Sequence, residues 1–170
     1  MKLTLKLEDS EYPFNGFTHT RPIARAILMD KEGKIAIHRI FRDDKFCRQG
    51  YFETPGGGID EGETPEEACK RECREEIGCE IEVIKEIAII EDAYNLIGRK
   101  NVNHYFLAME KNLGKRHFES EGDQYIQETL WVDLGEAIAL YEAMPNEKVS
   151  LLVKQRELPI LKALAAGKFN

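Results

Sequence analysis

Hydrophobic and polar residues alternate at the start of the chain in the pattern of a half-buried strand. Within residues 1–8, a leucine occupies every second position from Leu3 onward. A period of two places these leucines on one face of a strand. Residues 11–21 contain proline, asparagine and glycine and predict a loop. Residues 1–21 are therefore expected to form an N-terminal strand and loop ahead of the core.

Apolar runs rich in β-branched and aromatic residues predict the strands of a sheet farther along the chain. Two of them, residues 22–29 and 34–40, flank the turn sequence DKEG and predict a hairpin. The remaining predicted strands are residues 50–54, 80–91, 102–110 and 125–133. Residues 111–124 lack periodicity and predict an exposed loop.

A helix is predicted over residues 65–77 from the signals at its two ends. Thr64 suits the N-cap position, Pro65 the first helical position and Glu67 the reciprocal member of a capping box. Gly78 suits the position that ends the helix, because glycine readily adopts the left-handed conformation.

Two further helices are predicted near the end of the chain, over residues 134–144 and 147–166. We expect Asn146 to cap the second of these, Pro159 to interrupt it and Gly167 to end it. Strands with one helix among them and two helices at the end predict an α/β fold. In such a fold, helices pack on the faces of a mixed sheet.

The sequence PGGG at 55–58, ahead of the helix at 65–77, is expected to form a tight loop. Proline lacks an amide hydrogen, and three glycines leave the backbone free to adopt positive φ. Neither a strand nor a helix is expected to continue through them.

Three glutamates are expected to project from one face of the helix that follows. Glu72, Glu75 and Glu76 stand at i, i+3 and i+4, a spacing that brings side chains together. A divalent cation such as Mg²⁺ or Mn²⁺ would neutralise their repulsion, because both ions prefer oxygen ligands. An acidic, solvated helix face is the alternative interpretation.

The stretch from Gly57 to Cys79, GGIDEGETPEEACKRECREEIGC, resembles the Nudix box of the Nudix hydrolase family. Every fixed position of that pattern is filled, by Gly57, Glu63, Arg71, Glu72, Glu75, Glu76 and Gly78. Cys73 and Cys79 stand where the family has bulky aliphatic residues, and buried thiols behave as small hydrophobic groups. A match at seven fixed positions in a loop-helix context is a specific signal.

The resemblance implies a Nudix-type α/β/α sandwich with a mixed β-sheet, in a single domain over residues 1–170 with its core at 22–167. It implies hydrolysis of the pyrophosphate bond in a nucleoside diphosphate linked to another moiety, with Mg²⁺ or Mn²⁺. The substrate would be a small nucleotide such as a nucleoside triphosphate, ADP-ribose, a nucleotide sugar or a dinucleoside polyphosphate. Isoprenoid diphosphate isomerases and nucleotide-sensing modules of the same fold are the alternative, which the complete box disfavours.

The resemblance also assigns roles within the box. Glu72, Glu75 and Glu76 would hold the metal, and one of the box glutamates would take a proton from water. Main-chain groups at Gly57 would approach the metal, where a side chain would obstruct them. Arg71 would pair with an acidic box residue, Glu63 first, and so orient the ligands.

Several residues outside the box are candidates for the same site. Many relatives add an acid from a later loop, for which Glu119, Glu121, Asp123 and Glu128 are available and Glu121 is favoured. Arg39 and Arg42 can clamp a phosphate or ribose, or can simply favour solubility. Glu53 resembles the glutamate that precedes the box in ADP-ribose-cleaving members, whereas Tyr94 resembles a base-stacking tyrosine of dinucleoside polyphosphate hydrolases. These two hints favour different substrates.

The amino-acid composition disfavours some classes of binding partner. The 170 residues include 31 acidic and 24 basic side chains, a net charge of −7, which disfavours polymeric nucleic acid and anionic membranes as partners. The four cysteines form no CxxC pair and predict packing thiols in a reducing, cytoplasmic compartment. The four histidines lack ligand spacing and are interpreted as ordinary residues. The N-terminal strand could pair with a second subunit, making a homodimer possible.

Overall fold

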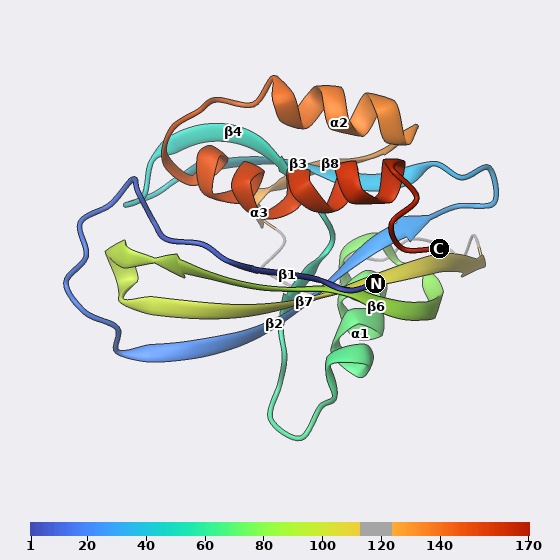
Figure 1. Ribbon diagram of the computed structural model, residues 1–170, viewed down its shortest axis with the longest axis horizontal. Helices are drawn as coiled ribbons and strands as arrows, with labels where there is room; N and C mark the ends of the chain where they lie inside the picture. The colour runs from blue at the N-terminus through green and yellow to red at the C-terminus, as the bar shows by residue number, and fades with distance from the viewer. Residues whose placement is uncertain (113–123) are drawn as a thin grey trace.

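The computed structural model describes residues 1–112 and 124–170, which form a mixed sheet between helices (Figure 1). In chain order the elements are β1 (Leu3–Lys6), β2 (His19–Met29), β3 (Ile35–Asp43), β4 (Arg48–Glu53), β5 (Gly56–Gly58), α1 (Pro65–Ile77), β6 (Glu80–Tyr94), η1 (Asn95–Ile97), β7 (Arg99–Asn112), β8 (Ile126–Val132), α2 (Leu134–Glu142) and α3 (Lys148–Ala165). The predicted strands are all present, though several boundaries shift; β2, for instance, begins inside the predicted loop.

The sheet combines parallel and antiparallel neighbours. Its order is β1-β6-β7-β2-β3-β4, with β5 paired to β2 and β8 paired to β3. Strand β1 lies parallel to β6, and β2 lies parallel to β7, whereas the other pairs are antiparallel. The predicted mixed sheet is confirmed.

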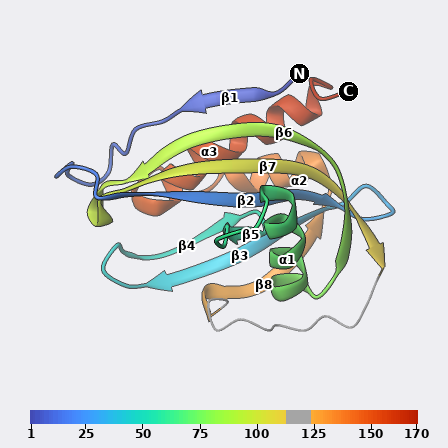
Figure 2. The same cartoon turned by 90° about the horizontal axis from the view of Figure 1, so that it is seen from below.

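Strands β2 and β3 meet at one pair of residues and then diverge (Figure 2). Met29 lies opposite Ile35, across a turn closed by the amide of Asp30 and the carbonyl of Lys34 at 2.9 Å. Beyond this point β2 follows β7, whereas β3 follows β4 and β8. The predicted turn is present, but the hairpin does not extend beyond it, because each strand finds its longer ladder elsewhere.

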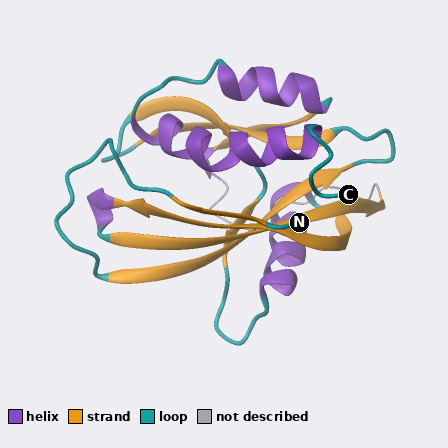
Figure 3. Ribbon diagram, viewed as in Figure 1, coloured by secondary structure: helices purple, strands orange, loops and turns teal. Residues whose placement is uncertain are grey.

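Helices cover both faces of the sheet, with α1 on one side and α2 and α3 on the other (Figure 3). Successive side chains of β2 contribute to two buried clusters, because they alternate between the faces of the sheet. Leu28 packs with Cys69, Cys73 and other residues of α1, and Ile27 packs with residues of α2 and α3. The predicted α/β/α sandwich is confirmed.

The four cysteines are free and buried, in agreement with their interpretation as packing residues.

Helix α1 begins and ends as predicted. The Thr64 side chain accepts a hydrogen bond from the Glu67 amide, and the Glu67 side chain accepts one from the Thr64 amide. Gly78 follows with φ 74°, in the left-handed region.

Helix α3 departs from prediction at two positions. Its N-cap residue is Glu147 rather than Asn146, and Asn146 instead accepts a hydrogen bond from Lys154 Nζ at 2.7 Å. Pro159 lies inside α3 without interrupting it. Residues beyond the proline, such as Ile160, are buried in the core, and their packing outweighs the loss of one backbone hydrogen bond.

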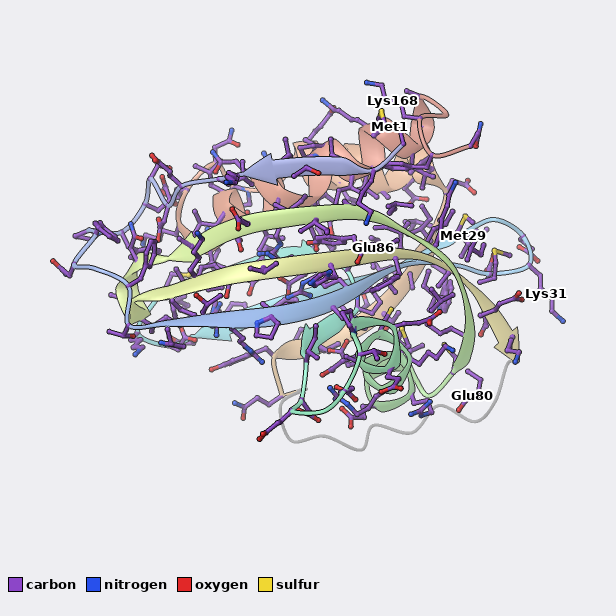
Figure 4. The ribbon with its side chains drawn as sticks, turned by 60° about the horizontal axis from the view of Figure 1, so that its bottom comes forward. Met1, Met29, Lys31, Glu80, Glu86 and Lys168 are labelled. Atoms are coloured by element: carbon purple, nitrogen blue, oxygen red, sulfur yellow. The ribbon has the colours of Figure 1, made fainter. Side chains whose placement is uncertain are left out.

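Strand β1 pairs with β6 of its own chain, with Leu5 opposite Ile90, and its leucines pack against the core below α3. Pairing of this strand with a second subunit stays a prediction. Met1 and Lys168 lie beside one another at one end of the molecule (Figure 4). Within the described residues, no helix combines the length and apolar character needed to cross a bilayer.

Candidate active site

The glycine-rich segment forms a short strand instead of the predicted loop. Gly56–Gly58 pairs antiparallel with β2, with Gly56 opposite Arg25. A Cβ atom on Gly56 would lie 2.4 Å from the carbonyl oxygen of Ala24, and its φ of +153° is one that other residues rarely adopt. The prediction failed because it considered only the flexibility of glycine, whereas here the missing side chain permits close pairing of two backbones.

This bare backbone lies directly against two carboxylates of α1. The amide of Gly56 donates a hydrogen bond to Glu76 Oε1 at 2.8 Å. A Cβ atom on Gly57 would lie 2.6 Å from Glu72 Oε1. The segment and the helix therefore form one unit, with Glu72 and Glu76 facing the main chain of β5.

Arg71 fixes the other acidic residues of the box. Its guanidinium binds Glu63 through two bonds, Nε to Oε2 at 2.8 Å and Nη2 to Oε1 at 3.0 Å. Its Nη1 atom contacts Glu72 at 2.9 Å and Glu75 at 3.1 Å. The hydrogen bond from Arg71 holds the pKa of Glu63 below its ordinary value. The predicted pairing of Arg71 with Glu63 is present.

Glu72 occupies an unusual environment for a carboxylate. Burial, followed by the nearby charge of Glu76, raises the pKa of Glu72 to about 7, against the opposing effect of Arg71. Two carboxylates held close together in a partly dry site attract a cation.

A divalent cation fits this set of donors. Carboxylate oxygens are the ligands that Mg²⁺ and Mn²⁺ prefer, and the missing side chain of Gly57 lets the Glu72 carboxylate lie against the main chain. In the described part of the chain, no three acidic, cysteine or histidine side chains already converge as a metal site, and Arg71 binds both Glu72 and Glu75. Glu72 and Glu76 are the residues best placed to hold the ion.

Both glutamates border a cleft of about 390 Å³ that opens where β2 and β3 diverge. Its lining includes basic, aromatic and acidic side chains: Arg21, Arg25, His38, Arg42, Phe46, Tyr51, Glu53, Glu72, Glu76, Tyr94, Arg99 and Tyr125. The lining of the cleft thus combines three carboxylates with four arginines. This distribution suits an anion whose charge is shared between a cation and guanidinium groups.

Only some of the residues predicted outside the box lie in the cleft. Arg42, Glu53 and Tyr94 line the cleft. Arg39 does not, because it forms an exposed ion pair with Glu128 at 2.9 Å, away from the cleft. The acids at 119, 121 and 123, including the favoured Glu121, lie outside the described residues.

His38 belongs to the cleft although it was interpreted as an ordinary residue. It is 2% exposed, and its Nδ1 atom lies 3.0 Å from Thr129 Oγ1. Its Nε2 atom lies 3.4 Å from Glu76 Oε1. No spacing rule connects His38 with Glu76, because the contact depends on how β3 lies against α1.

Arg21, Arg25 and Arg99 were also missed. Arg25 interrupts the apolar run of β2, and that charge within a buried strand was an available signal. Burial and the nearby charge of Arg21 lower the pKa of Arg99, so these two guanidiniums repel one another. An anion in the cleft would relieve that repulsion.

Comparison with known proteins agrees with this geometry. A family model described as NUDIX domain matches residues 19–153. The chain is 29% identical over 173 residues to an ADP-ribose pyrophosphatase of Bacillus subtilis, covering 98% of this chain and 90% of the relative. It is 32% identical over 115 residues to an 8-oxo-dGTP diphosphatase of Haemophilus influenzae, covering 65% and 74%. A solved NUDIX hydrolase from Nitrosomonas europaea shares the fold, with a TM-score of 0.67, 19% identity and coverage of 88% and 90%.

Proposed function

The chain belongs to the NUDIX domain family, and from that premise we propose that it hydrolyses the pyrophosphate bond of a nucleoside diphosphate linked to another moiety. The observation that carries the proposal is that Glu72 and Glu76 line the same cleft as several arginines. A pyrophosphate bears several negative charges that repel an attacking water, so catalysis requires that these charges be neutralised.

Different residues would supply the charge neutralisation, the positioning and the proton acceptor that hydrolysis requires. Glu72 and Glu76 would hold Mg²⁺ or Mn²⁺, which supplies charge neutralisation at the phosphates when bound. Arg71 would keep Glu72 in place, since it ties Glu72 to Glu63 and to the carbonyl of Gly58. One of the box glutamates would accept the proton of the attacking water.

The arginines would hold the remaining negative charge of the substrate. Arg21 and Arg99 lie on neighbouring strands, and each lines the cleft. Guanidinium groups bind phosphate oxygens in bidentate fashion. Arg42 also lines the cleft, although its guanidinium already binds Asp44 at 2.8 and 3.0 Å. Arg21, and Arg99 through the nitrogens that do not bind Asn101, are therefore the first candidates for phosphate contact.

Among substrates, ADP-ribose is the first candidate. The relative named as an ADP-ribose pyrophosphatase aligns with nearly the whole chain, and Glu53, in the segment that resembles ADP-ribose-cleaving members, lines the cleft. The relative named as an 8-oxo-dGTP diphosphatase supports an oxidised deoxynucleoside triphosphate as a second candidate.

A substrate panel tests the function. ADP-ribose, 8-oxo-dGTP and diadenosine polyphosphates would be incubated with Mg²⁺ or Mn²⁺, and the products separated by ion-exchange chromatography. We expect at least one substrate to be cleaved at its pyrophosphate, and EDTA to abolish the reaction. Activity that survives EDTA, or a panel left uncut, would contradict the proposal.

A matched pair of variants locates the activity. Glu72→Gln should reduce turnover by on the order of 10²-fold or more, because it removes a charge that the cation needs. Glu61→Gln changes an exposed acid of the same box segment that lies outside the cleft, and its turnover should match wild type. Equal losses in both variants would indicate that the acidity of the segment matters rather than the cleft.

A further inference from the structure

Helix α3 carries two consecutive charged residues that are almost entirely buried. Arg156 is 1% exposed and Glu157 is 0% exposed. The carboxylate of Glu157 accepts hydrogen bonds from the Thr54 amide at 2.9 Å and the Thr54 hydroxyl at 2.7 Å. Thr54 directly follows β4, so α3 fixes the backbone at the point where β4 enters the cleft. A buried charge is retained only where its partners are well placed.

Arg156 uses its guanidinium in the same region. Its Nη2 atom lies 2.6 Å from Glu53 Oε2, and its Nη1 atom donates to the Tyr94 hydroxyl at 3.1 Å. Its Nη1 and Nε atoms also bind Asp92 at 2.9 Å and the Tyr105 hydroxyl at 2.8 Å. Glu53 and Tyr94 line the cleft, whereas Arg156 itself lies behind its wall.

Glu53 is held by two arginines on one oxygen only. Arg25 Nη2 approaches the same Oε2 atom at 3.2 Å. No described residue donates a hydrogen bond to the other oxygen, Oε1, and the Glu53 side chain keeps 17% of its surface exposed. Burial alone would raise the pKa of Glu53, but Arg25 and Arg156 together hold it below its ordinary value. An ionised acceptor with one free oxygen thus borders the cleft.

We propose that Arg156 is a positioning residue that aims Glu53 Oε1 and the Tyr94 ring at a substrate bound in the cleft. Glu53 would accept a hydrogen bond from a hydroxyl or amino group of that substrate, and Tyr94 would pack against it. This inference rests on the proposed function. It also adds to the family match, which ends at residue 153 and does not include Arg156.

The geometry requires arginine rather than any cation. Arg156 reaches four partners through three nitrogen atoms fixed in one plane. A lysine supplies one ammonium at a single point and cannot hold Glu53, Asp92 and Tyr94 in the same relation. Arg156→Lys therefore keeps the buried charge and removes the alignment.

Steady-state kinetics of Arg156→Lys test the proposal. With ADP-ribose, or with the panel member that wild type cleaves, we expect KM to rise about tenfold and kcat to change less than about threefold, because the lost contacts bind substrate rather than assist bond cleavage. The Mg²⁺ concentration for half-maximal rate should not change, because Arg156 contacts neither Glu72 nor Glu76 in the described structure.

Lys154→Met is the matched control. Lys154 is a buried cation of the same helix whose ammonium binds the Glu142 carbonyl and the Asn146 side chain, away from the cleft. It should lower Tm and leave KM unchanged. If Arg156→Lys also lowers Tm or the active fraction without raising KM, Arg156 is only structural and the proposal is wrong.

Tyr94→Phe covers the case in which Arg156→Lys does not fold. It removes only the hydroxyl that Arg156 holds, and KM should rise about threefold, consistent with the loss of one hydrogen bond; an unchanged KM overturns the proposal. If wild type cleaves nothing, calorimetric binding of ADP-ribose replaces KM. Binding weakened by Arg156→Lys would then support the inference while the proposed function fails, and binding that is absent or unchanged would overturn the inference.

Discussion

The carboxylate of Glu72 rests against the backbone of Gly57, where a Cβ atom would lie 2.6 Å from Oε1. The obstacle is the end of a flexible side chain rather than main chain, and Gly57 does not have a positive φ. A methyl group at this position would therefore displace Glu72 more readily than it would unfold the protein.

Gly57→Ala is expected to separate activity from stability. It should lower kcat/KM by about 10–100-fold, because a shift of about 1 Å in a catalytic group has effects of this size, while Tm stays close to wild type. Gly50→Ala is the control, since its Cβ atom would meet an ordinary contact at 3.6 Å. A fall in Tm without a specific loss of activity would show that Gly57 serves folding instead.

Arg71→Lys tests whether the guanidinium fork matters beyond its charge. Lysine cannot reproduce the paired bonds to Glu63 while also reaching Glu72 and Glu75. We expect a loss of about 10–100-fold in activity together with weaker Mg²⁺ activation, as for other residues that orient metal ligands. Arg74→Lys, at an exposed position of the same helix, should leave both unchanged. Full activity in Arg71→Lys would show that Arg71 contributes only its positive charge.

Stability of the metal-free protein should depend on pH through Glu72. Burial and the charge of Glu76 raise the pKa of Glu72 to about 7 in the folded state, from an ordinary value of 4.5, so between these values the folded state binds more protons than the unfolded state. The stabilisation that this proton gives is fully present below about pH 4.5 and is lost as pH rises through about 7. The loss in the free energy of unfolding is at most about 3 kcal/mol.

Thermal melts in EDTA from pH 5 to 8 measure this effect. In Glu72→Gln, Tm should fall less steeply between pH 5 and 8 than in wild type. Its Tm at pH 8 should be higher, because glutamine carries no charge to repel Glu76. Glu61→Gln should leave the slope as in wild type. A wild-type slope that persists in Glu72→Gln would assign the titration to another group.

Cys73→Ala should reduce stability and spare catalysis. The side chain of Cys73 is fully buried among Ala68, Cys69 and Ile77, and its removal should cost about 1 kcal/mol through lost packing. Denaturant titration would show the loss, and kcat should stay within about twofold of wild type, because packing residues do not touch the reacting atoms. Loss of all activity in a folded variant would indicate that the cysteines have a role in the site.

The sequence was most informative where the determining signals are local. The capping box of α1 and its terminal glycine lie within a few residues of the positions that they define, so the helix was predicted to the residue. The pairing of Arg71 with Glu63 was implied by the resemblance to the Nudix box, and the structure shows the two side chains in contact across eight positions of loop and helix.

Predictions failed where contacts between distant segments decide the outcome. The strand at Gly56–Gly58 exists because β2 is available to pair with it. Helix α3 continues through Pro159 because the core buries the residues beyond it. His38 and Arg39 point to opposite faces because they are successive residues of β3, but which face borders the cleft depends on the strands and helices that pack around β3.

The contact between Arg156 and Glu53 spans 103 residues of sequence, which has a consequence for biosynthesis. Helix α1 can form as soon as residues 57–79 have left the ribosome. Arg156 can hold Glu53 and Tyr94 only after α3 has also left it. Long-range contacts of this kind form late in folding. Until α3 has emerged, Glu53 and Tyr94 lack their contacts with Arg156, and substrate affinity should appear only after that point.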